Sequence, residues 1–361
     1  MYMITRVLIM SLTTTICKPA NHLDLVKRVI EGGERLSEIE TEFLFDYFWH
    51  HPDASYQCCA TLAVLKSRGE TKEEVLGLSR VVAQKMKRLS LDVSRAIDVG
   101  GTGGGIPTFN ISTTVAFVLA AAGCQVCKHG NFKVSSRSGS FDLLDALKIR
   151  TDLLALPAVA TKLYQKLGVT FLATKSYHNH PTFLSEMRTS LGVGTALNVI
   201  GPLLNPACVP FQIVGVSNPK WFDTMAEVLI GQGRKAFMLV HGMEGMDELS
   251  PCGETMVLEY KGGLVRRYTL CPNDFGLDSL SVSHLEGGSP EDNARIFHDI
   301  IENRSKVRVQ AILPMAAAAF FICGAVNNIH EGVKLARETV SSGAVVTLLS
   351  KLRGALDENA D

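Results

Sequence analysis

The sequence lacks an excess of charge of either sign. Its 361 residues include 36 lysines and arginines and 36 aspartates and glutamates, so the formal net charge at pH 7 is zero. A balanced chain has no overall attraction for nucleic acid or for an anionic membrane surface. We therefore expect no nucleic-acid partner, and any site for a polyanion has to be built locally.

Long apolar runs are also missing. The longest, Val115–Ala122 and Met315–Ile322, fall well short of the ~20 residues that a transmembrane helix needs. The apolar stretch Val7–Met10 is too short for a signal peptide, and no clear cleavage site follows it. We expect no contact with a membrane.

The nine cysteines form no regular framework. They include one adjacent pair, Cys58 and Cys59, and one isolated CxxC, Cys124 to Cys127. A structural zinc site needs four ligands, and no second pair follows, so two small buried residues at a strand explain the CxxC more simply. The pattern predicts reduced thiols in a cytoplasmic protein.

With 46% hydrophobic and 7% aromatic residues, the composition is that of a compact globular protein, and the length suggests roughly two domains. No internal repeat or low-complexity linker is visible. We expect helices over about 22–92, because capping boxes occur at Ser37 with Glu40 and at Thr71 with Glu74.

From Ile97 onward, short β-prone runs alternate with turns and helices. The expected strands are Ile97–Val99, Gln125–Cys127, Phe211–Val216 and Ala236–Val240, with a helix over Thr113–Ala122 between the first two. Strand, glycine turn, helix and strand in this order predict a right-handed crossover and a parallel sheet. Ligands bind at the carboxyl ends of such strands.

The fold class we predict is α/β, with a small helical domain and a larger α/β domain whose central, mostly parallel sheet is flanked by helices. The boundaries that we predict are 1–21 for an N-terminal extension, 22–92 for the helical domain and 93–361 for the α/β domain. Part of the last segment is expected to pack with the helical domain.

A glycine-rich stretch follows the first predicted strand. Five of the six residues from Gly100 to Gly105 are glycine, and Asn110, Ser112 and Thr113 follow at the start of the next helix. Glycines let the backbone turn and approach a ligand closely, and a helix N-terminus favours anions. A plain tight turn before a capped helix is the alternative. The position between strand and helix favours an anion site.

A second polar cluster comes directly after the strand expected at Gln125–Cys127. Lys128, His129 and Asn131 are followed by a serine-rich stretch over 135–140. A lysine, an amide and several hydroxyls suit a diphosphate and the hydroxyls of a ribose. A solvated loop would explain any one of these residues, but their density at a strand end favours a site.

Two adjacent acids, Asp247 and Glu248, follow the strand expected at Ala236–Val240. Magnesium prefers a few carboxylates together with substrate phosphates and water. An isolated acidic pair is more often a solvated surface pair. The phosphate-binding motifs elsewhere in the chain favour the metal site.

Taken together, these motifs resemble those of the anthranilate phosphoribosyltransferases, and the similarity extends from about residue 22 onward. Their superfamily also contains the pyrimidine nucleoside phosphorylases, but Asn110–Thr113 and Asp247–Leu249 favour the anthranilate branch. The other segments that carry the resemblance are Gly101–Gly104, Lys128–Asn131, Ser135–Ser140 and Thr195–Ala207.

The resemblance implies a homodimeric, magnesium-dependent enzyme that moves phosphoribose from phosphoribosyl pyrophosphate to the amine of anthranilate, a step of tryptophan biosynthesis. No side chain acts as a nucleophile, and Lys128 and His129 are candidates for stabilising and orienting the reactants. The implied donor contacts are Gly101, Gly104, Thr108, Asn110, Ser112, Thr113, Lys128, Asn131, Ser135, Ser136 and Ser140. The implied acceptor contacts are Gly101, Asn131 and Arg188, and the implied metal ligands are Ser112, Asp247 and Glu248.

The chain departs from the family's pattern in the donor motifs. An aspartate that usually follows the two central glycines is deleted, because the turn continues from Gly105 directly to Ile106. The usual arginine after Asn131 is Phe132, a usual proline is Thr174, and a usual late asparagine is Pro314. These changes leave two alternatives open: a different aromatic acid or amine as acceptor, and a non-catalytic ligand-binding relative. The number of metal ions also stays open.

Overall fold

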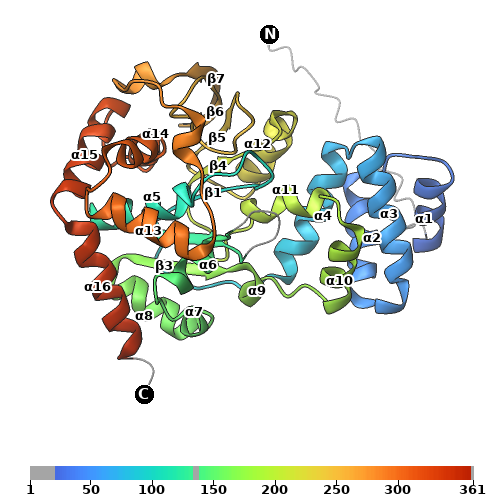
Figure 1. Ribbon diagram of the computed structural model, residues 1–361. Helices are drawn as coiled ribbons and strands as arrows, with labels where there is room; N and C mark the ends of the chain where they lie inside the picture. The colour runs from blue at the N-terminus through green and yellow to red at the C-terminus, as the bar shows by residue number, and fades with distance from the viewer. Residues whose placement is uncertain (1–20, 133–137, 359–361) are drawn as a thin grey trace, which may run out of the picture.

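The first four helices form a layer of their own (Figure 1). The computed structural model describes residues 21–132 and 138–358. Both predicted capping boxes are present: the hydroxyls of Ser37 and Thr71 accept from the backbone N–H groups of Glu40 and Glu74, whose carboxylates accept in return. The four helices are α1 (His22–Ile30), α2 (Glu38–His50), α3 (Ser55–Arg68) and α4 (Lys72–Lys85).

The seven strands form one sheet in the order β3-β2-β1-β4-β5-β6-β7. The first five strands of that order pair in parallel, and β6 and β7 pair antiparallel at one edge. The prediction of a mostly parallel α/β sheet is therefore confirmed. The strands are β1 (Ile97–Gly101), β2 (Val126–Gly130), β3 (Val169–Ala173), β4 (Phe211–Gly215), β5 (Ala236–Gly242), β6 (Thr255–Lys261) and β7 (Leu264–Leu270).

One predicted boundary is wrong in a way that matters. Strand β2 does not end at Cys127 but pairs with β3 as far as Gly130, so Lys128 and His129 lie inside the strand. The strand ends where its pairing with β3 ends. Paired residues, such as Val126 and Val169, are 43 positions apart, so the local sequence cannot show this end.

The helices of the α/β part cover both faces of the sheet (Figure 1). Helix α5 begins two residues before the predicted start, at Ile111. The remaining helices are α5 (Ile111–Ala121), α6 (Ser140–Ala146), α7 (Thr151–Leu154), α8 (Pro157–Leu167), α9 (Thr174–Tyr177), α10 (Thr182–Leu191), α11 (Ala196–Ile200), α12 (Phe222–Gly231), α13 (Pro290–Ile301), α14 (Lys306–Ile322), α15 (Ile329–Ser341) and α16 (Ala344–Asp357).

Strand β5 shows how the sheet separates two apolar cores. Met238 and Val240 pack with α5 and α14, whereas Phe237 and Leu239 face α12 and the helical layer. Successive side chains of a strand point to opposite faces, so a strand covered on both sides is apolar throughout. All seven residues of β5 are buried.

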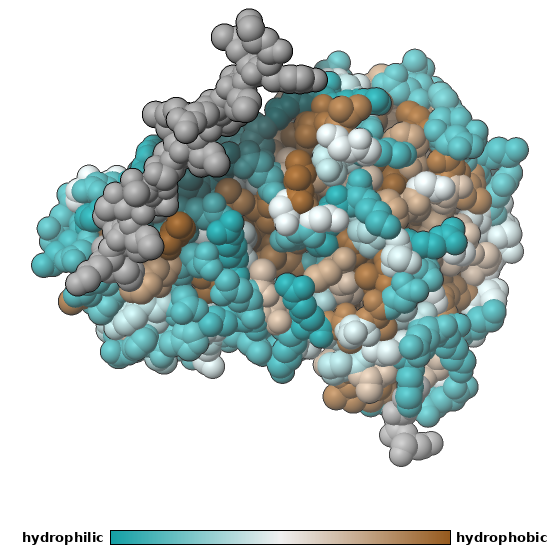
Figure 2. Space-filling view, turned by 180° about the vertical axis from the view of Figure 1, so that it is seen from behind, coloured by the Kyte–Doolittle hydropathy of each residue, from teal (hydrophilic) through white to brown (hydrophobic). Residues whose placement is uncertain are grey.

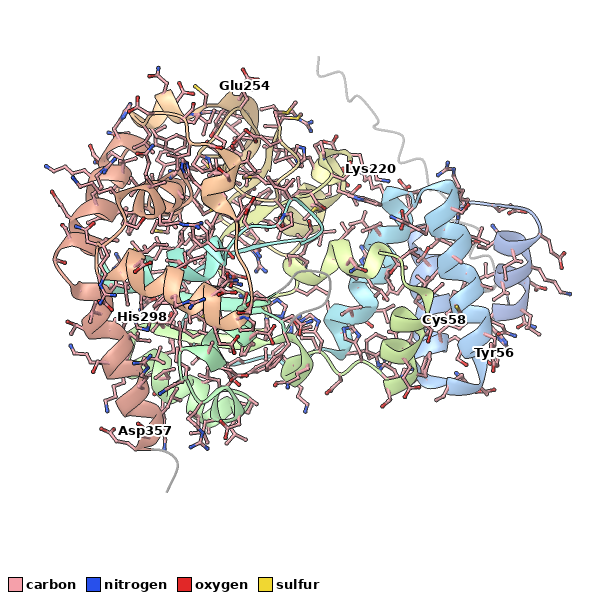
Figure 3. All side chains as sticks on the ribbon, in the orientation of Figure 1. Tyr56, Cys58, Lys220, Glu254, His298 and Asp357 are labelled. Carbon is pink, nitrogen blue, oxygen red and sulfur yellow. The ribbon has the colours of Figure 1, made fainter. Side chains whose placement is uncertain are left out.

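The chain returns to the helical layer after β3. Helix α10 packs against α3 and α11 packs against α4, and Leu184, Met187 and Leu197 share a core with residues of α1–α4. Figure 3 shows Cys58 of α3 within this layer and Tyr56 at its outer surface. The helical layer therefore contains chain from both sides of residue 92, and the domain boundary stays a prediction.

Hydrophilic side chains cover much of the face in Figure 2, with smaller apolar patches between them. At the sheet's edge, β7 exposes Leu264, Val265, Arg266 and Arg267. Within the described residues, no single helix has the length and apolar character to cross a membrane. Helices α13 and α14 meet these two criteria only when they are taken together, and the angle between them is 86°.

Candidate active site

A cavity of about 240 Å³ lies at the carboxyl ends of β1 and β2. Its walls come from segments that are distant in sequence. They include the glycine turn 100–103 with Asp98, residues 129–132, Gly139 and Ser140, residues from Thr174 to His180, residues 197–202, and Val82 of the helical layer. Strand β1 lies between β2 and β4, where the order of the sheet reverses. Such a switch point is where ligands bind in open α/β sheets.

The glycine turn is built around Asp247. Its carboxylate Oδ2 accepts from the backbone N–H of Gly103 at 2.7 Å, and a Cβ on Gly101 would come within 2.5 Å of the same oxygen. Gly103 and Gly104 have φ values of +69° and +81°, which explains why these two positions need glycine. The turn and the acidic motif, 144 residues apart in sequence, form one unit.

Lys128 is buried beneath the turn, where its ammonium donates to the carbonyl oxygen of Val99 at 2.5 Å and to Ser112 Oγ at 3.2 Å. Burial lowers the pKa of Lys128, while Asp98 and Glu248 act in the opposite direction. A buried ammonium between two acids and a helix N-terminus places positive charge at the strand ends.

Asp98 opens the segment that contains the glycine-rich stretch, but the sequence assigns it no role. Its Oδ1 accepts from the backbone N–H of His129 at 3.1 Å, and its Oδ2 accepts from Asn205 Nδ2 at 2.9 Å and Gln212 Nε2 at 3.4 Å. It also lines the cavity, and burial raises its pKa while Lys128 lowers it. An acid inside an apolar strand is a signal that could have found it.

Three histidine rings line the cavity in a row. The centroids of His129 and His178 are 4.9 Å apart in a stacked pair, and those of His178 and His180 are 5.6 Å apart. Burial lowers the pKa of His129 well below its ordinary value, and it lowers that of His178 to about 4. Both rings are therefore neutral near pH 7. In the sequence, His178 and His180 alternate like a pair of metal ligands, but without a third ligand the pattern indicates only a loop.

The acidic pair is not a surface pair, because Glu248 is buried and Asp247 is half-buried. Burial raises the pKa of Asp247, and burial together with Asp247 raises that of Glu248 well above its ordinary range. In the described part of the chain, Glu248 Oε2 is buried without a hydrogen-bond partner. Two neighbouring buried carboxylates with an unpartnered oxygen fit a divalent cation, which supplies both the charge and the contact.

The described residues contain no cluster of three or more His, Cys, Asp or Glu side chains suited to a metal ion. The acidic pair can therefore provide only part of a coordination shell. Ser112 lies next to it, since its backbone N–H donates to Glu248. Water and substrate phosphates are the usual remaining ligands of magnesium.

The other predicted contacts divide into two sets. Gly101, Asn131 and Ser140 line the cavity. The cavity is not lined by Gly104, Thr108, Asn110 or Thr113. Asn110 donates to the Ser138 carbonyl and accepts from Asn293. Within the described residues, the buried hydroxyl of Thr113 has no hydrogen-bond partner. Ser135, Ser136 and the side chain of Arg188, a residue of α10, lie outside the described residues.

Comparisons with known proteins agree with this arrangement. The model of the glycosyl transferase family, a/b domain, matches residues 93–346. The anthranilate phosphoribosyltransferase of Persephonella marina is 37% identical over 91% of this chain and 97% of its own, and that of Anaeromyxobacter sp. (strain K) is 38% identical over the same shares. The chain belongs to the anthranilate phosphoribosyltransferase family. The resemblance inferred from the motifs is confirmed.

Solved structures of this family share the fold. The enzyme from Thermus thermophilus has a TM-score of 0.84 and 35% identity, with 92% of this chain and 99% of that chain covered. The Saccharomyces cerevisiae enzyme in complex with PRPP and Mg has a TM-score of 0.83 at 24% identity, with 93% and 98% covered. At that lower identity the likeness concerns the fold alone.

Proposed function

We propose that this chain is a pentosyltransferase of tryptophan biosynthesis. It moves phosphoribose from phosphoribosyl pyrophosphate to the amine of anthranilate and releases pyrophosphate. The observation that carries the proposal is the direct contact between the glycine turn and Asp247 beside the cavity, with Lys128 beneath the same strand ends. Family membership supports the same reaction.

The donor's diphosphate binds at the glycine turn. The N-terminus of α5 and the buried Lys128 ammonium supply positive potential next to the glycine turn, at one edge of the sheet. The predicted contacts from Gly101, Gly104, Thr108, Asn110, Ser112, Thr113, Lys128, Asn131 and Ser140 cover the phosphates and the ribose. Ser135 and Ser136 complete the predicted set.

Magnesium binds at Asp247, Glu248 and Ser112. The unpartnered Glu248 oxygen and the burial of both acids support this assignment. When bound, the ion neutralises the charge that develops on the leaving pyrophosphate. Asp247 also accepts from Gly103, so metal binding and the shape of the glycine turn are linked through one carboxylate.

The protein's own contribution is to position the reactants and stabilise charge. An aromatic amine carries a usable lone pair, so the reaction needs no nucleophilic side chain. Lys128 stabilises the diphosphate, and the neutral His129 in the cavity wall orients the acceptor. Arg188 of α10 is our candidate for the acceptor's carboxylate, which a guanidinium can hold in a fork.

The departure at Phe132 has a structural counterpart. Lys175 Nζ lies 3.9 Å from the centroid of the Phe132 ring, which lines the cavity. A cation over an aromatic face is attracted by the ring. Lys175 thus brings positive charge to the rim where the family's arginine is missing, and the rim differs in shape from the usual one. This difference favours testing a second aromatic acid as acceptor.

The homodimer is also part of the proposal. Helices α2 and α3 expose Ile39, Phe43 and Tyr56, and the exposed fraction of Tyr56 is 87%. Figure 3 shows Tyr56 on the outer side of the helical layer. Exposed apolar side chains that gather on one surface mark interaction sites.

The test is turnover by the purified chain with anthranilate, phosphoribosyl pyrophosphate and magnesium, read as loss of anthranilate fluorescence. Calorimetry with the donor alone is run in parallel. Turnover supports the proposal. Donor binding with turnover only on another aromatic acid favours the changed acceptor, and absence of donor binding with and without magnesium contradicts the proposal altogether.

A further inference from the structure

Cys124 of the CxxC motif lies next to Cys323 and not next to Cys127. Cys127 is buried inside β2, whereas the Sγ atom of Cys124 lies 4.0 Å from that of Cys323. The two residues are 199 positions apart in sequence. Both are half-buried, both are free thiols, and both pack at the margin of the larger core.

The fold places these thiols by the same device at two helix ends. Helix α5 ends at Ala121, and Gly123, with a φ of +89°, turns the chain towards Cys124. Helix α14 ends at Ile322, and Gly324, with a φ of +76°, follows Cys323. Helices α5 and α14 pack along one another, so their C-terminal ends meet. Left-handed glycines are the common way to end a helix.

The surroundings make the two sulfurs unequal. The contact with Cys124 lowers the pKa of Cys323, and burial acts in the opposite direction. The Cys323 thiol also donates to the carbonyl oxygen of Phe320 at 3.5 Å. The contact with Cys323, followed by burial, raises the pKa of Cys124. Of the two thiols, Cys323 loses its proton more easily, so it suits the attacking role and Cys124 the resolving role.

We propose that Cys124 and Cys323 form a reversible oxidation site, at which a low-molecular-weight disulfide converts the two thiols into an intramolecular disulfide. The observation that carries this is the 4.0 Å separation of two half-buried sulfurs on adjacent helix ends. Rotation of the two side chains has to shorten that distance to about 2.05 Å. The site is independent of the phosphoribosyl transfer.

The reaction balances as a thiol–disulfide exchange. The Cys323 thiolate attacks one sulfur of the oxidant, the oxidant's S–S bond breaks, and one small thiolate leaves. Cys124 then gives its proton to solvent, and its thiolate attacks Cys323 Sγ and expels the second small thiolate. The two cysteines are oxidised by two electrons, and the oxidant is reduced to two thiols.

The test uses the full chain with oxidised glutathione as probe. After incubation with the probe or with dithiothreitol, free thiols are alkylated and the protein is digested and mapped by mass spectrometry without reduction. We expect a peptide that links Cys124 to Cys323 and disappears with dithiothreitol. The exposed Cys208 is the internal comparison and should carry only a mixed disulfide.

Variants sharpen the result. Cys124→Ser should stop the reaction at glutathione on Cys323, while the matched control Cys252→Ser should leave the linked peptide unchanged. The oxidised wild type should also melt at a higher temperature than the reduced protein, because the new bond closes a very long loop. A disulfide between Cys124 and Cys127, or no disulfide at Cys124 in the oxidised wild type, overturns the proposal. This test uses the wild type alone, so it does not depend on whether the variants fold.

Discussion

The hydroxyl of Thr174 lies 3.1 Å from Nε2 of His129 and 3.0 Å from the carbonyl oxygen of Gly130. The hydroxyl of Thr174 donates its hydrogen bond to the Gly130 carbonyl. Its oxygen therefore accepts from Nε2 of His129, which is the protonated nitrogen of the neutral ring. This leaves Nδ1 of His129 as an acceptor. Thr174, in place of the family's usual proline, therefore fixes the tautomer of a histidine in the cavity wall.

Replacing Thr174 by valine should weaken acceptor use. The loss of one hydrogen bond, worth about 1 kcal/mol, predicts a fall of about fivefold in kcat/KM for the aromatic acceptor. The KM for phosphoribosyl pyrophosphate should stay unchanged. Steady-state rates by anthranilate fluorescence measure both, and Thr161→Val on α8 is the matched control. An equal loss with respect to both substrates would show that Thr174 only supports the fold.

Glu248→Gln should make the protein more stable and less active. The substitution keeps the shape of the side chain and removes a carboxyl group whose ionisation is disfavoured by burial and by Asp247, so the melting temperature should rise. Magnesium-dependent donor binding should weaken about a hundredfold or more, because the ion loses a carboxylate ligand. Calorimetry and thermal melts check the two effects, and the exposed Glu254→Gln should change neither. Unaltered donor affinity would rule Glu248 out as a ligand.

Gly215→Ala should displace Asp247 and so distort the glycine turn. A Cβ at this end of β4 would lie 1.6 Å from the backbone oxygen of Asp247, so either the strand or the acidic loop has to move. We expect a loss of stability of about 1–3 kcal/mol or more and the loss of magnesium-dependent donor binding. Gly231→Ala, where a Cβ meets nothing within 4 Å, is the control. Normal donor binding by Gly215→Ala would show that Asp247 is not tied to the turn.

The stability of the fold should fall in mild acid because of His178. Its pKa is about 4 in the folded chain, below the ordinary value of 6.5, so the unfolded chain binds the proton first as pH decreases. At about pH 5 this group should cost about 2 kcal/mol relative to neutral pH. Urea unfolding at about pH 7.5 and pH 5 measures the difference. His178→Gln should reduce the dependence by this amount and leave the part that comes from His129, whose pKa burial also lowers. The exposed His284→Gln should leave the dependence unchanged.

Local signals in the sequence are sufficient for part of the fold. The capping boxes at Ser37 and Thr71 act within four residues, so they can be read directly from the chain, and both are present. The end of β2 cannot be read in this way, because it depends on pairing with β3. The motif around Lys128 marks this residue as important, but local sequence puts it in a loop, whereas it lies buried in a strand.

The site shows the same division. The acids at 247–248 and the glycine turn are visible as motifs, but their mutual contact spans 144 positions and requires the fold. The role of Asp98 cannot be predicted from the sequence, because its partners Asn205 and Gln212 are more than 100 positions away. The role of His178 cannot be predicted either, because it depends on stacking with the His129 ring. Motifs identify chemistry one segment at a time, and the contacts between segments come only with the structure.

The edge strand β7 also has a consequence for how the protein behaves at high concentration. With a net charge of zero, the chain has no long-range repulsion to keep its copies apart. The sheet ends on a strand whose exposed residues include Leu264 and Val265, and an exposed edge strand can pair with another strand. Arg266 and Arg267, the latter paired with Asp223, place charge on this edge. Colloidal solubility therefore depends on two arginines at one rim of the sheet, and neutral, β-prone replacements there should make the protein self-associate without altering its active site.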